Sequence, residues 1–283
     1  MKKVTLGMCV YDDFDGAYFS CQANRLMHPM LDAQGEILII DNNPSSKFGI
    51  ATKNFAQSTE FVRYVPFTER TGTSVRNKIF DLAQGEVVIC IDCHVLLVPG
   101  SIEALLAYFD AAPSEQPLLV QGPMLRDTLH AETRFWHDVW ARGMHGFWSR
   151  NMPLAESDVL PFEIDNMGLG TFAARRSQWL RFNDLFRTFG GEEGYIHRKY
   201  QKHGGRCICL PSFKWVHRFA RPLGQPYPHA FRDRIFNYCI GCFELDEQVD
   251  RALDYLSLLY PSWIVDEVYE EARSSFLRHA DVT

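Results

Sequence analysis

The segment Glu86-Val-Val-Ile-Cys-Ile-Asp-Cys-His94 decides the fold class of this chain, because an apolar run ends here on an acid and a histidine. The run 87–91 has the length and composition of a strand buried on both faces. Asp92 and His94 are two positions apart, so their oxygen and nitrogen atoms leave the strand on one side and could bind a metal ion. Alternatively, Asp92 caps a following helix and His94 packs in a loop. The triplet alone favours neither interpretation.

The first half of the chain alternates strand and helix patterns around that run. We expect strands at 4–10, 36–40, 59–66, 87–91 and 118–121, and helices at 16–30, 74–84 and 101–109. Such alternation predicts a parallel, doubly wound sheet. Ligands bind these sheets at the carboxyl ends of the strands, so Asp41 and Asp92 are expected to face one crevice.

Composition limits the possible classes of protein. A chain of 283 residues, 46% of them hydrophobic, can bury one large α/β core or two smaller ones. The formal charge of −6 argues against a general polyanion binder. The first apolar run, 4–10, is too short for a signal peptide, and no later run is long enough to cross a bilayer, so we expect a cytoplasmic protein.

The eight cysteines are expected to be reduced and buried, because no secretion signal accompanies them. Two Cys-x-x-Cys pairs, at 90–93 and 239–242, keep a structural zinc site as a weaker alternative.

The segment 134–150 is dense in aromatic residues and arginines. One interpretation is an amphipathic helix at the edge of the domain. The other, which we favour, is an acceptor-binding wall, because aromatic rings stack on sugars or bases and arginines hold phosphate or carboxylate. Its candidate residues are Arg134, Trp136, Trp140 and Trp148. The tail 232–280 is predicted to be mostly helical, with a break at Tyr260-Pro261.

Six motifs occur in an order that resembles the GT-A glycosyltransferases. They are Asp41, Arg70 to Asn77, Asp92-Cys93-His94, the segment 168–176, Gly190-Gly-Glu-Glu193 and Val216-His217-Arg218. Within that class the chain is most similar to polypeptide N-acetylgalactosaminyltransferases and other family 2 enzymes. The resemblance implies an α/β GT-A fold, a Rossmann-like nucleotide-sugar-binding sheet flanked by helices. It places a catalytic domain at 1–228, with a nucleotide-binding half (1–110) and an acceptor and metal half (111–228), before a C-terminal helical extension at 229–283.

The resemblance implies a metal site and a donor site. In the family, an Asp-x-His element and a later histidine bind Mn²⁺, which carries the diphosphate of a nucleotide sugar. Asp92, His94 and His217 match these ligands, for Mn²⁺ or Mg²⁺. The donor is expected to be a UDP-sugar, and the matching donor-binding residues are Asp41 and Arg70 for the base and Arg218, Arg221 and Tyr227 for the diphosphate. For Arg70, the alternative is a salt bridge to Glu69 or a neighbour.

Glu192 resembles the family glutamate that touches the donor sugar or the acceptor. Glu193 occupies a position where inverting members have an aspartate base and retaining members have asparagine, so the stereochemical outcome stays open. Both acids could also cap the helix expected to begin near Tyr195.

The resulting expectation is a metal-dependent, hexosyltransferase-type enzyme that transfers a sugar from a UDP-sugar to a hydroxyl group. The acceptor would be a protein, a glycan or a hydroxymethylated base in phage DNA, in a bacterial cell or a phage-infected host. No membrane partner is expected. The alternative is a non-catalytic nucleotide-sugar-binding or assembly protein that retains the fold. Degenerate members usually lose a metal ligand or the Gly-Gly-Glu acid, and this chain keeps both.

Overall fold

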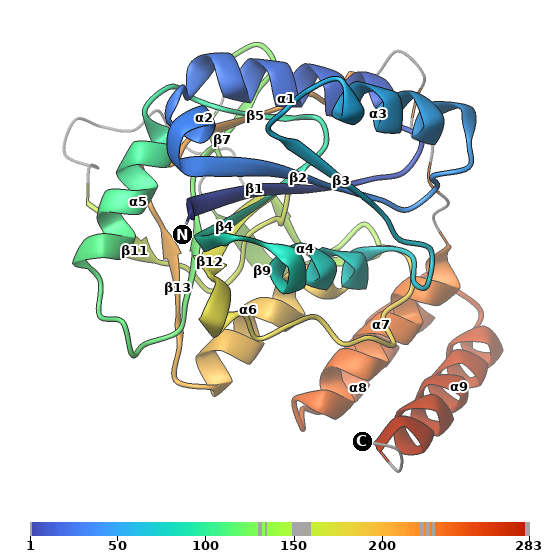
Figure 1. Ribbon diagram of the computed structural model, residues 1–283. Helices are drawn as coiled ribbons and strands as arrows, with labels where there is room; N and C mark the ends of the chain where they lie inside the picture. Colours follow the sequence, from blue (N-terminus) through green and yellow to red (C-terminus); the bar gives the residue numbers. More distant parts are fainter. Residues whose placement is uncertain are drawn as a thin grey trace.

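The computed structural model describes residues 2–129, 132–133, 135–148, 160–220, 224, 227 and 230–280; of 132, 136–138, 148 and 280 it describes the backbone alone. A mixed sheet runs through the molecule with helices on both faces (Figure 1). In spatial order its strands are β11 (Phe162–Glu163), β13 (Arg206–Cys209), β6 (Leu118–Gln121), β12 (Thr171–Arg175), β4 (Gly85–Asp92), β1 (Lys2–Val10), β2 (Gly35–Asp41) and β3 (Val62–Pro66).

The α/β prediction is confirmed, but the sheet is not wholly parallel. Strands β4, β1, β2 and β3 are parallel neighbours, whereas β12 runs antiparallel to both β4 and β6. A parallel return to the sheet needs a crossover, usually a helix. The described residues between β6 and β12 contain no helix, so the chain re-enters the sheet in the opposite direction. As a result, the start of β12 lies at the same edge as the end of β4.

The helices divide between two hydrophobic cores, one on each face of the sheet (Figure 1). Strand β2 shows the division, because Ile37 and Ile39 belong to one core and Leu38 and Ile40 to the other, as alternation along a strand requires. The first core contains α1 (Phe14–Met27), α2 (Met30–Gln34), α3 (Lys47–Gln57) and α5 (Ser101–Ala111). The second contains α4 (Arg76–Leu82), which follows the short helix η1 (Thr73–Val75), and α6 (Glu192–Lys202), with η2 (Arg176–Gln178) after β12.

The helical tail is confirmed. It consists of α7 (Phe231–Glu244), α8 (Asp250–Ser257) and α9 (Ser262–Ala280), and α9 begins directly after Pro261. These helices contribute to the same core as α4 and α6, and α7 packs against both α6 and α9. None of the helices in the described part of the chain combines the length and apolar character that spanning a bilayer requires.

A second, smaller sheet orders β5 (Val95–Leu97), β14 (Trp215–His217), β7 (Met124–Arg126) and β8 (Glu132–Thr133). A separate hairpin joins β9 (Trp136–Ala141) to β10 (Met144–Trp148). The helix interpretation of this segment is therefore wrong over 135–148. The reason is the turn Arg142-Gly143, whose φ angles of 53° and 76° are those of a tight hairpin turn.

All eight cysteines are free, and seven of them are buried. Cys90 and Cys93 belong to opposite cores, so this pair cannot share a zinc ion. The cysteines are therefore reduced and mostly buried, as expected.

Candidate active site

A cavity of about 300 Å³ opens at the carboxyl ends of β1 and β4. This is the edge at which α/β sheets bind ligands. Five of the residues singled out in the sequence line it: Asp92, His94, Glu192, Glu193 and Tyr227.

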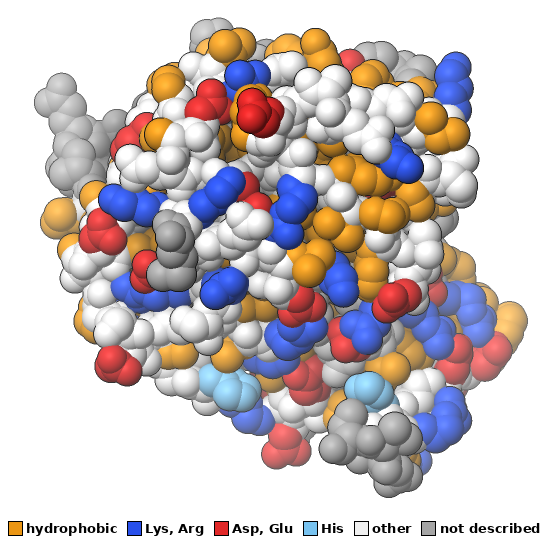
Figure 2. Space-filling view, viewed as in Figure 1, with side chains coloured by type: hydrophobic (Ala, Val, Ile, Leu, Met, Phe, Trp, Pro, Cys, Tyr) orange, Lys and Arg blue, Asp and Glu red, His pale blue; other side chains and the backbone are white. Residues whose placement is uncertain are grey.

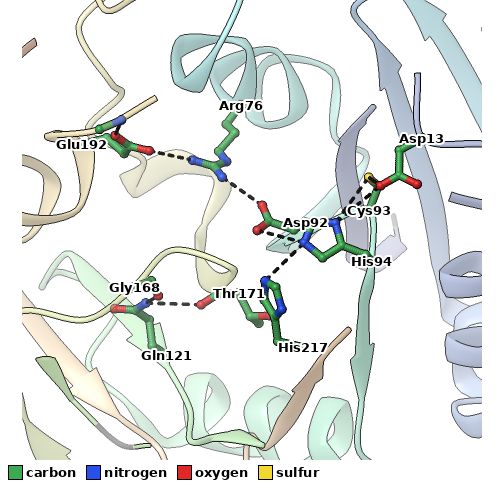
Figure 3. Close-up of polar contacts among 11 residues, drawn as sticks. Asp13, Arg76, Asp92, Cys93, His94, Gln121, Gly168, Thr171, Glu192 and His217 are labelled. Atoms are coloured by element: carbon green, nitrogen blue, oxygen red, sulfur yellow. Dashed lines mark hydrogen bonds and ion pairs between the residues drawn. The ribbon is translucent and has the colours of Figure 1, made fainter. Parts of the chain in front are cut away.

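Asp92, His94 and His217 converge beside this cavity (Figure 3). Pairing of β14 with β5 sets His217 opposite Val95, next to His94 in the chain. The Nε2 atoms of His94 and His217 are 3.2 Å apart, and His94 Nε2 is 3.8 Å from the Asp92 carboxylate. Adjacent ligands of an octahedral ion with bonds of about 2.1 Å lie about 3 Å apart. One carboxylate and two imidazoles therefore fit a divalent cation that accepts mixed oxygen and nitrogen ligands.

Asp13 lies behind His94 and was not identified in the sequence. It caps α1 by accepting a hydrogen bond from the Gly16 amide, at 2.9 Å. Its other oxygen accepts from Cys93 Sγ at 3.2 Å and lies 3.7 Å from His94 Nδ1. Burial alone would raise the pKa of Asp13, but hydrogen bonds from His94, Cys93 and Gly16 hold that pKa below its usual value. Asp13 is therefore an anionic partner that fixes the orientation of the His94 ring.

Asp13→Asn is expected to weaken Mn²⁺ binding about 10- to 100-fold, the usual effect of removing a carboxylate behind a histidine ligand. Asparagine also caps helices well, so α1 should remain intact. The measurement is Mn²⁺ titration followed by electron paramagnetic resonance. Asp15→Asn, in the first turn of the same helix, is the matched control and should bind Mn²⁺ as the wild type does. Equal affinities in the two variants would contradict this role of Asp13.

Arg76 is a buried cation between two acidic side chains of the site (Figure 3). Its Nη2 lies 3.0 Å from Asp92 Oδ1, and its Nη1 lies 3.9 Å from Glu192 Oε1. Burial would raise the pKa of Asp92, but the charge of Arg76, helped by His94 and His217, holds that pKa below its usual value. Arg76 therefore keeps Asp92 in the anionic form that a metal ligand needs.

The motif Gly190-Gly-Glu-Glu193 forms the start of α6. Gly190 and Gly191 have φ angles of 109° and 91°, in the region that other residues rarely adopt, and they turn the chain so that the helix begins at Glu192. The helix begins three residues earlier than expected, and the Glu192 carboxylate accepts a hydrogen bond from the Gly190 amide, which precedes the helix. Within the described residues, no side-chain capping bond is present at the N-cap Gly191, so the two acids favour the helix start only through their charge in its first turn. Burial, and then the neighbouring Glu192 carboxylate, raise the pKa of Glu193 to about 8.

Three of the predicted donor-binding residues, Asp41, Arg70 and Arg218, have partners within the fold. Asp41 is fully buried and accepts hydrogen bonds from the Tyr64 hydroxyl at 2.7 Å and from a backbone amide at 2.9 Å. The next residue, Asn42, lines the cavity instead. Arg70 forms a salt bridge, as the alternative interpretation expected, but its partner is Asp184, from a distant segment, rather than Glu69.

The cationic groups on the cavity wall differ from those expected. Arg218 forms an ion pair with Asp15 at 2.9 Å and is not among the residues that line the cavity. The arginines that do line it, within the described residues, are Arg76 and Arg234. Arg234 Nη1 donates a hydrogen bond to the Gly143 carbonyl at 3.2 Å, which ties α7 to the hairpin.

The predicted acceptor wall is only partly described. Arg134 and Arg221 lie outside the described residues, as do the side chains of Trp136 and Trp148. Trp140 packs against Tyr238 and Tyr255, with ring centroids 4.9 and 5.1 Å away, and lines a second cavity. The hairpin reaches the first cavity through Met144.

The α/β sheet carries an Asp-x-His element at a strand end, a second small sheet adds a third candidate ligand, and paired acids lie at a helix start. This arrangement is similar to that of GT-A glycosyltransferases. The chain belongs to glycosyl transferase family 2, whose family model matches residues 31–180. None of the curated protein sequences compared with the chain matches it.

Solved structures with little sequence similarity share the fold. A structure of GalNAc-T7 with UDP, GalNAc and Mn²⁺ superposes with a TM-score of 0.66 at 16% identity, over 98% of this chain and 54% of that one. Residues 1–349 of S. aureus TarS, in complex with UDP-GlcNAc, give 0.57 at 12% identity, over 90% of this chain and 70% of that one. The chain therefore spans about half the length of the GalNAc-T7 structure.

Proposed function

We propose that this protein transfers a sugar from a UDP-sugar to a hydroxyl acceptor with the help of a divalent cation. The observation that carries the proposal is the convergence of Asp92, His94 and His217 beside a cavity that also contains Glu192 and Glu193. Supporting it, one structure that shares the fold contains UDP, GalNAc and Mn²⁺, and another contains UDP-GlcNAc.

The proposed roles follow from charge and position. A cation held by the three ligands would stabilise the negative charge that develops on the departing diphosphate. Arg76 keeps Asp92 anionic, and Arg234 adds a second positive charge at the cavity wall. Tyr227 lines the cavity and packs against Phe189, with ring centroids 4.9 Å apart, which supports a role in covering the diphosphate.

Glu193 is the candidate for accepting the proton of the acceptor hydroxyl. A base must be deprotonated to act, and a pKa of about 8 lies close to the working range of a cytoplasmic enzyme. The neighbouring Glu192, held by the Gly190 amide and facing Arg76, is suited to contact the sugar.

Glu193→Gln is expected to lower kcat about 10²- to 10⁴-fold, the usual contribution of a general base. In the wild type, transfer should rise as pH passes through about 8, where half of the Glu193 carboxyl groups are ionised, and level off at higher pH, where nearly all of them are. The folded-state pKa of Glu193 is raised, so its stabilising effect is complete at acidic pH and is lost as pH rises through about 8. Glu193→Gln should therefore unfold at a higher temperature than the wild type at pH 9.

Kinetics across pH and thermal unfolding at pH 6 and pH 9 measure these effects. Glu163→Gln, at an exposed glutamate away from the cavity, is the control and should leave both profiles unchanged. A wild-type profile that is flat between pH 6 and pH 9 would exclude Glu193 as the base.

The distribution of surface charge bears on the class of acceptor. Acidic and basic side chains are interspersed over the face drawn in Figure 2, which offers no broad basic surface for DNA. We therefore favour a glycan or protein hydroxyl over a hydroxymethylated base. A salt-dependent gel shift with hydroxymethylated duplex DNA would reverse this preference.

The direct test is binding of UDP, and hydrolysis of a panel of UDP-sugars, with and without Mn²⁺. The proposed function requires Mn²⁺-dependent UDP binding and release of UDP from at least one donor. Tight UDP binding without turnover of any donor, even with acceptors present, would instead support a non-catalytic nucleotide-sugar-binding protein. No UDP binding at all would exclude both.

A further inference from the structure

A second cavity, of about 350 Å³, lies between the β9–β10 hairpin, α6, α7 and α8. Consecutive residues line the two cavities: Met144 lines the first and His145 the second, and Glu193 lines the first and Gly194 the second. A ligand in the second cavity would therefore lie directly next to the candidate base.

The second cavity contains a buried amide with no protein partner. Asn166 is 3% exposed and lines the cavity. Within the described residues, neither its side-chain nitrogen nor its oxygen has a hydrogen-bond partner. Leaving a buried donor and acceptor unpaired is costly, so native proteins rarely keep one without a purpose. A ligand that both donates and accepts hydrogen bonds would satisfy the two atoms.

The walls and rim restrict the chemistry of that ligand. Trp140 and Tyr238 supply an aromatic corner, with ring centroids 4.9 Å apart. The charged groups at the rim are two acids and two arginines, Asp165, Glu247, Arg198 and Arg251, so their charges balance. Arg198 and Glu247 also pair with each other, with Arg198 Nε 2.8 and 3.0 Å from the carboxylate oxygens. A balanced rim does not select a phosphate or another charged ligand.

We propose that the second cavity binds a neutral saccharide unit. Sugar hydroxyls both donate and accept, which matches the amide of Asn166, and the apolar faces of sugar rings pack against aromatic side chains. We assign this saccharide to the acceptor, which the second cavity would hold while the first cavity glycosylates it, and this assignment rests on the proposed function. Binding of the saccharide itself does not depend on the proposed function.

Asn166→Leu tests the site, because it removes the amide and keeps a side chain of similar size. The probes are the methyl glycosides of glucose, galactose and N-acetylglucosamine, titrated onto the intact protein and followed by saturation-transfer NMR. We expect at least one to bind the wild type, and Asn166→Leu to weaken that binding at least tenfold while raising the unfolding temperature. A residue that only stabilises the fold would lower the unfolding temperature when lost.

Asn24→Leu is the matched control, since Asn24 is also a buried amide but is fully hydrogen-bonded, at 2.7–3.2 Å. It should lower the unfolding temperature and leave saccharide binding unchanged. Arg251→Ala changes an exposed rim residue without disturbing the core and should weaken binding at least threefold, whereas Arg278→Ala on α9 should not.

No binding of any of the three glycosides, or equal binding by the wild type, Asn166→Leu and Arg251→Ala, would overturn the proposal. Preferential binding of inorganic phosphate or of a peptide at this site would overturn the choice of ligand. UDP binding is measured in parallel on the same variants and should be unchanged. If the wild type binds a saccharide but not UDP, only the proposed function is refuted. If the wild type binds UDP but no saccharide, only the saccharide site is refuted.

Discussion

His217→Ala is expected to lower the affinity for UDP in the presence of Mn²⁺ by at least about 100-fold, because it removes one of the three proposed protein ligands. Losing a group that only supports a ligand lowers metal affinity by about 10- to 100-fold. Sugar transfer should fall to background in His217→Ala. Arg76 pairs with Asp92 Oδ1, whereas the histidines face the other carboxylate oxygen, so the loss of His217 should leave the pairing of Arg76 with Asp92 intact. Isothermal titration with UDP, at fixed Mn²⁺ and again with a chelator, measures the effect.

Measuring UDP binding with and without Mn²⁺ separates the loss of a metal ligand from a general loss of UDP binding. In the chelator, wild type and His217→Ala should bind UDP equally weakly, and only the wild type should gain affinity when Mn²⁺ is added. His203→Ala, at the end of α6 and away from both cavities, is the control and should behave as the wild type. If His217→Ala and the wild type respond identically to Mn²⁺, the three-ligand site is wrong. His94→Ala should match His217→Ala, since both imidazoles face the same point.

The parts of the site that the sequence predicted are those whose position follows from a single strand or from motif order. Asp92 and His94 follow a buried strand at a two-residue spacing, which is enough to place both at the sheet edge. Gly190 and Gly191 adopt positive φ angles and turn the chain into α6, which brings Glu192 and Glu193 to the cavity. These positions depend on local sequence, so they could be predicted without knowing the tertiary contacts.

The parts that the sequence did not reveal depend on contacts between distant elements. Asp13 looks like an ordinary helix cap until α1 packs behind His94. Arg76 was part of a recognised motif, but its role depends on Asp92 and Glu192 arriving from two other segments. The hairpin is a different case, because Gly143 is a turn signal but Arg142 does not favour the positive φ that it adopts there, so the sequence signals this turn weakly.

Arg76→Met is expected to destabilise the protein by about 3–5 kcal/mol, since removing one partner of a buried ion pair leaves the other uncompensated. The value should fall toward the lower end, because the Asp92 side chain is 27% exposed and water can reach it. Without the positive charge, Asp92 also loses the influence that lowers its pKa, so Mn²⁺-dependent UDP binding should weaken, and more so at acidic pH. Urea unfolding and UDP titration on the same preparations measure the two effects.

Arg175→Met separates the role of Arg76 in the site from a general cost of losing a buried arginine. Both arginines are 8% exposed, but Arg175 donates to backbone carbonyls at the end of α5, including those of Ala112 and Pro113 at 3.0 and 3.1 Å. Its loss should destabilise the fold and leave the UDP affinity of the folded protein unchanged. Adding Glu192→Gln to Arg76→Met should restore part of the lost stability, because it removes one of the two uncompensated acids, without restoring UDP binding. If Arg76→Met instead binds UDP as tightly as Arg175→Met does, Arg76 stabilises the core only, and Asp92 needs no help to stay anionic.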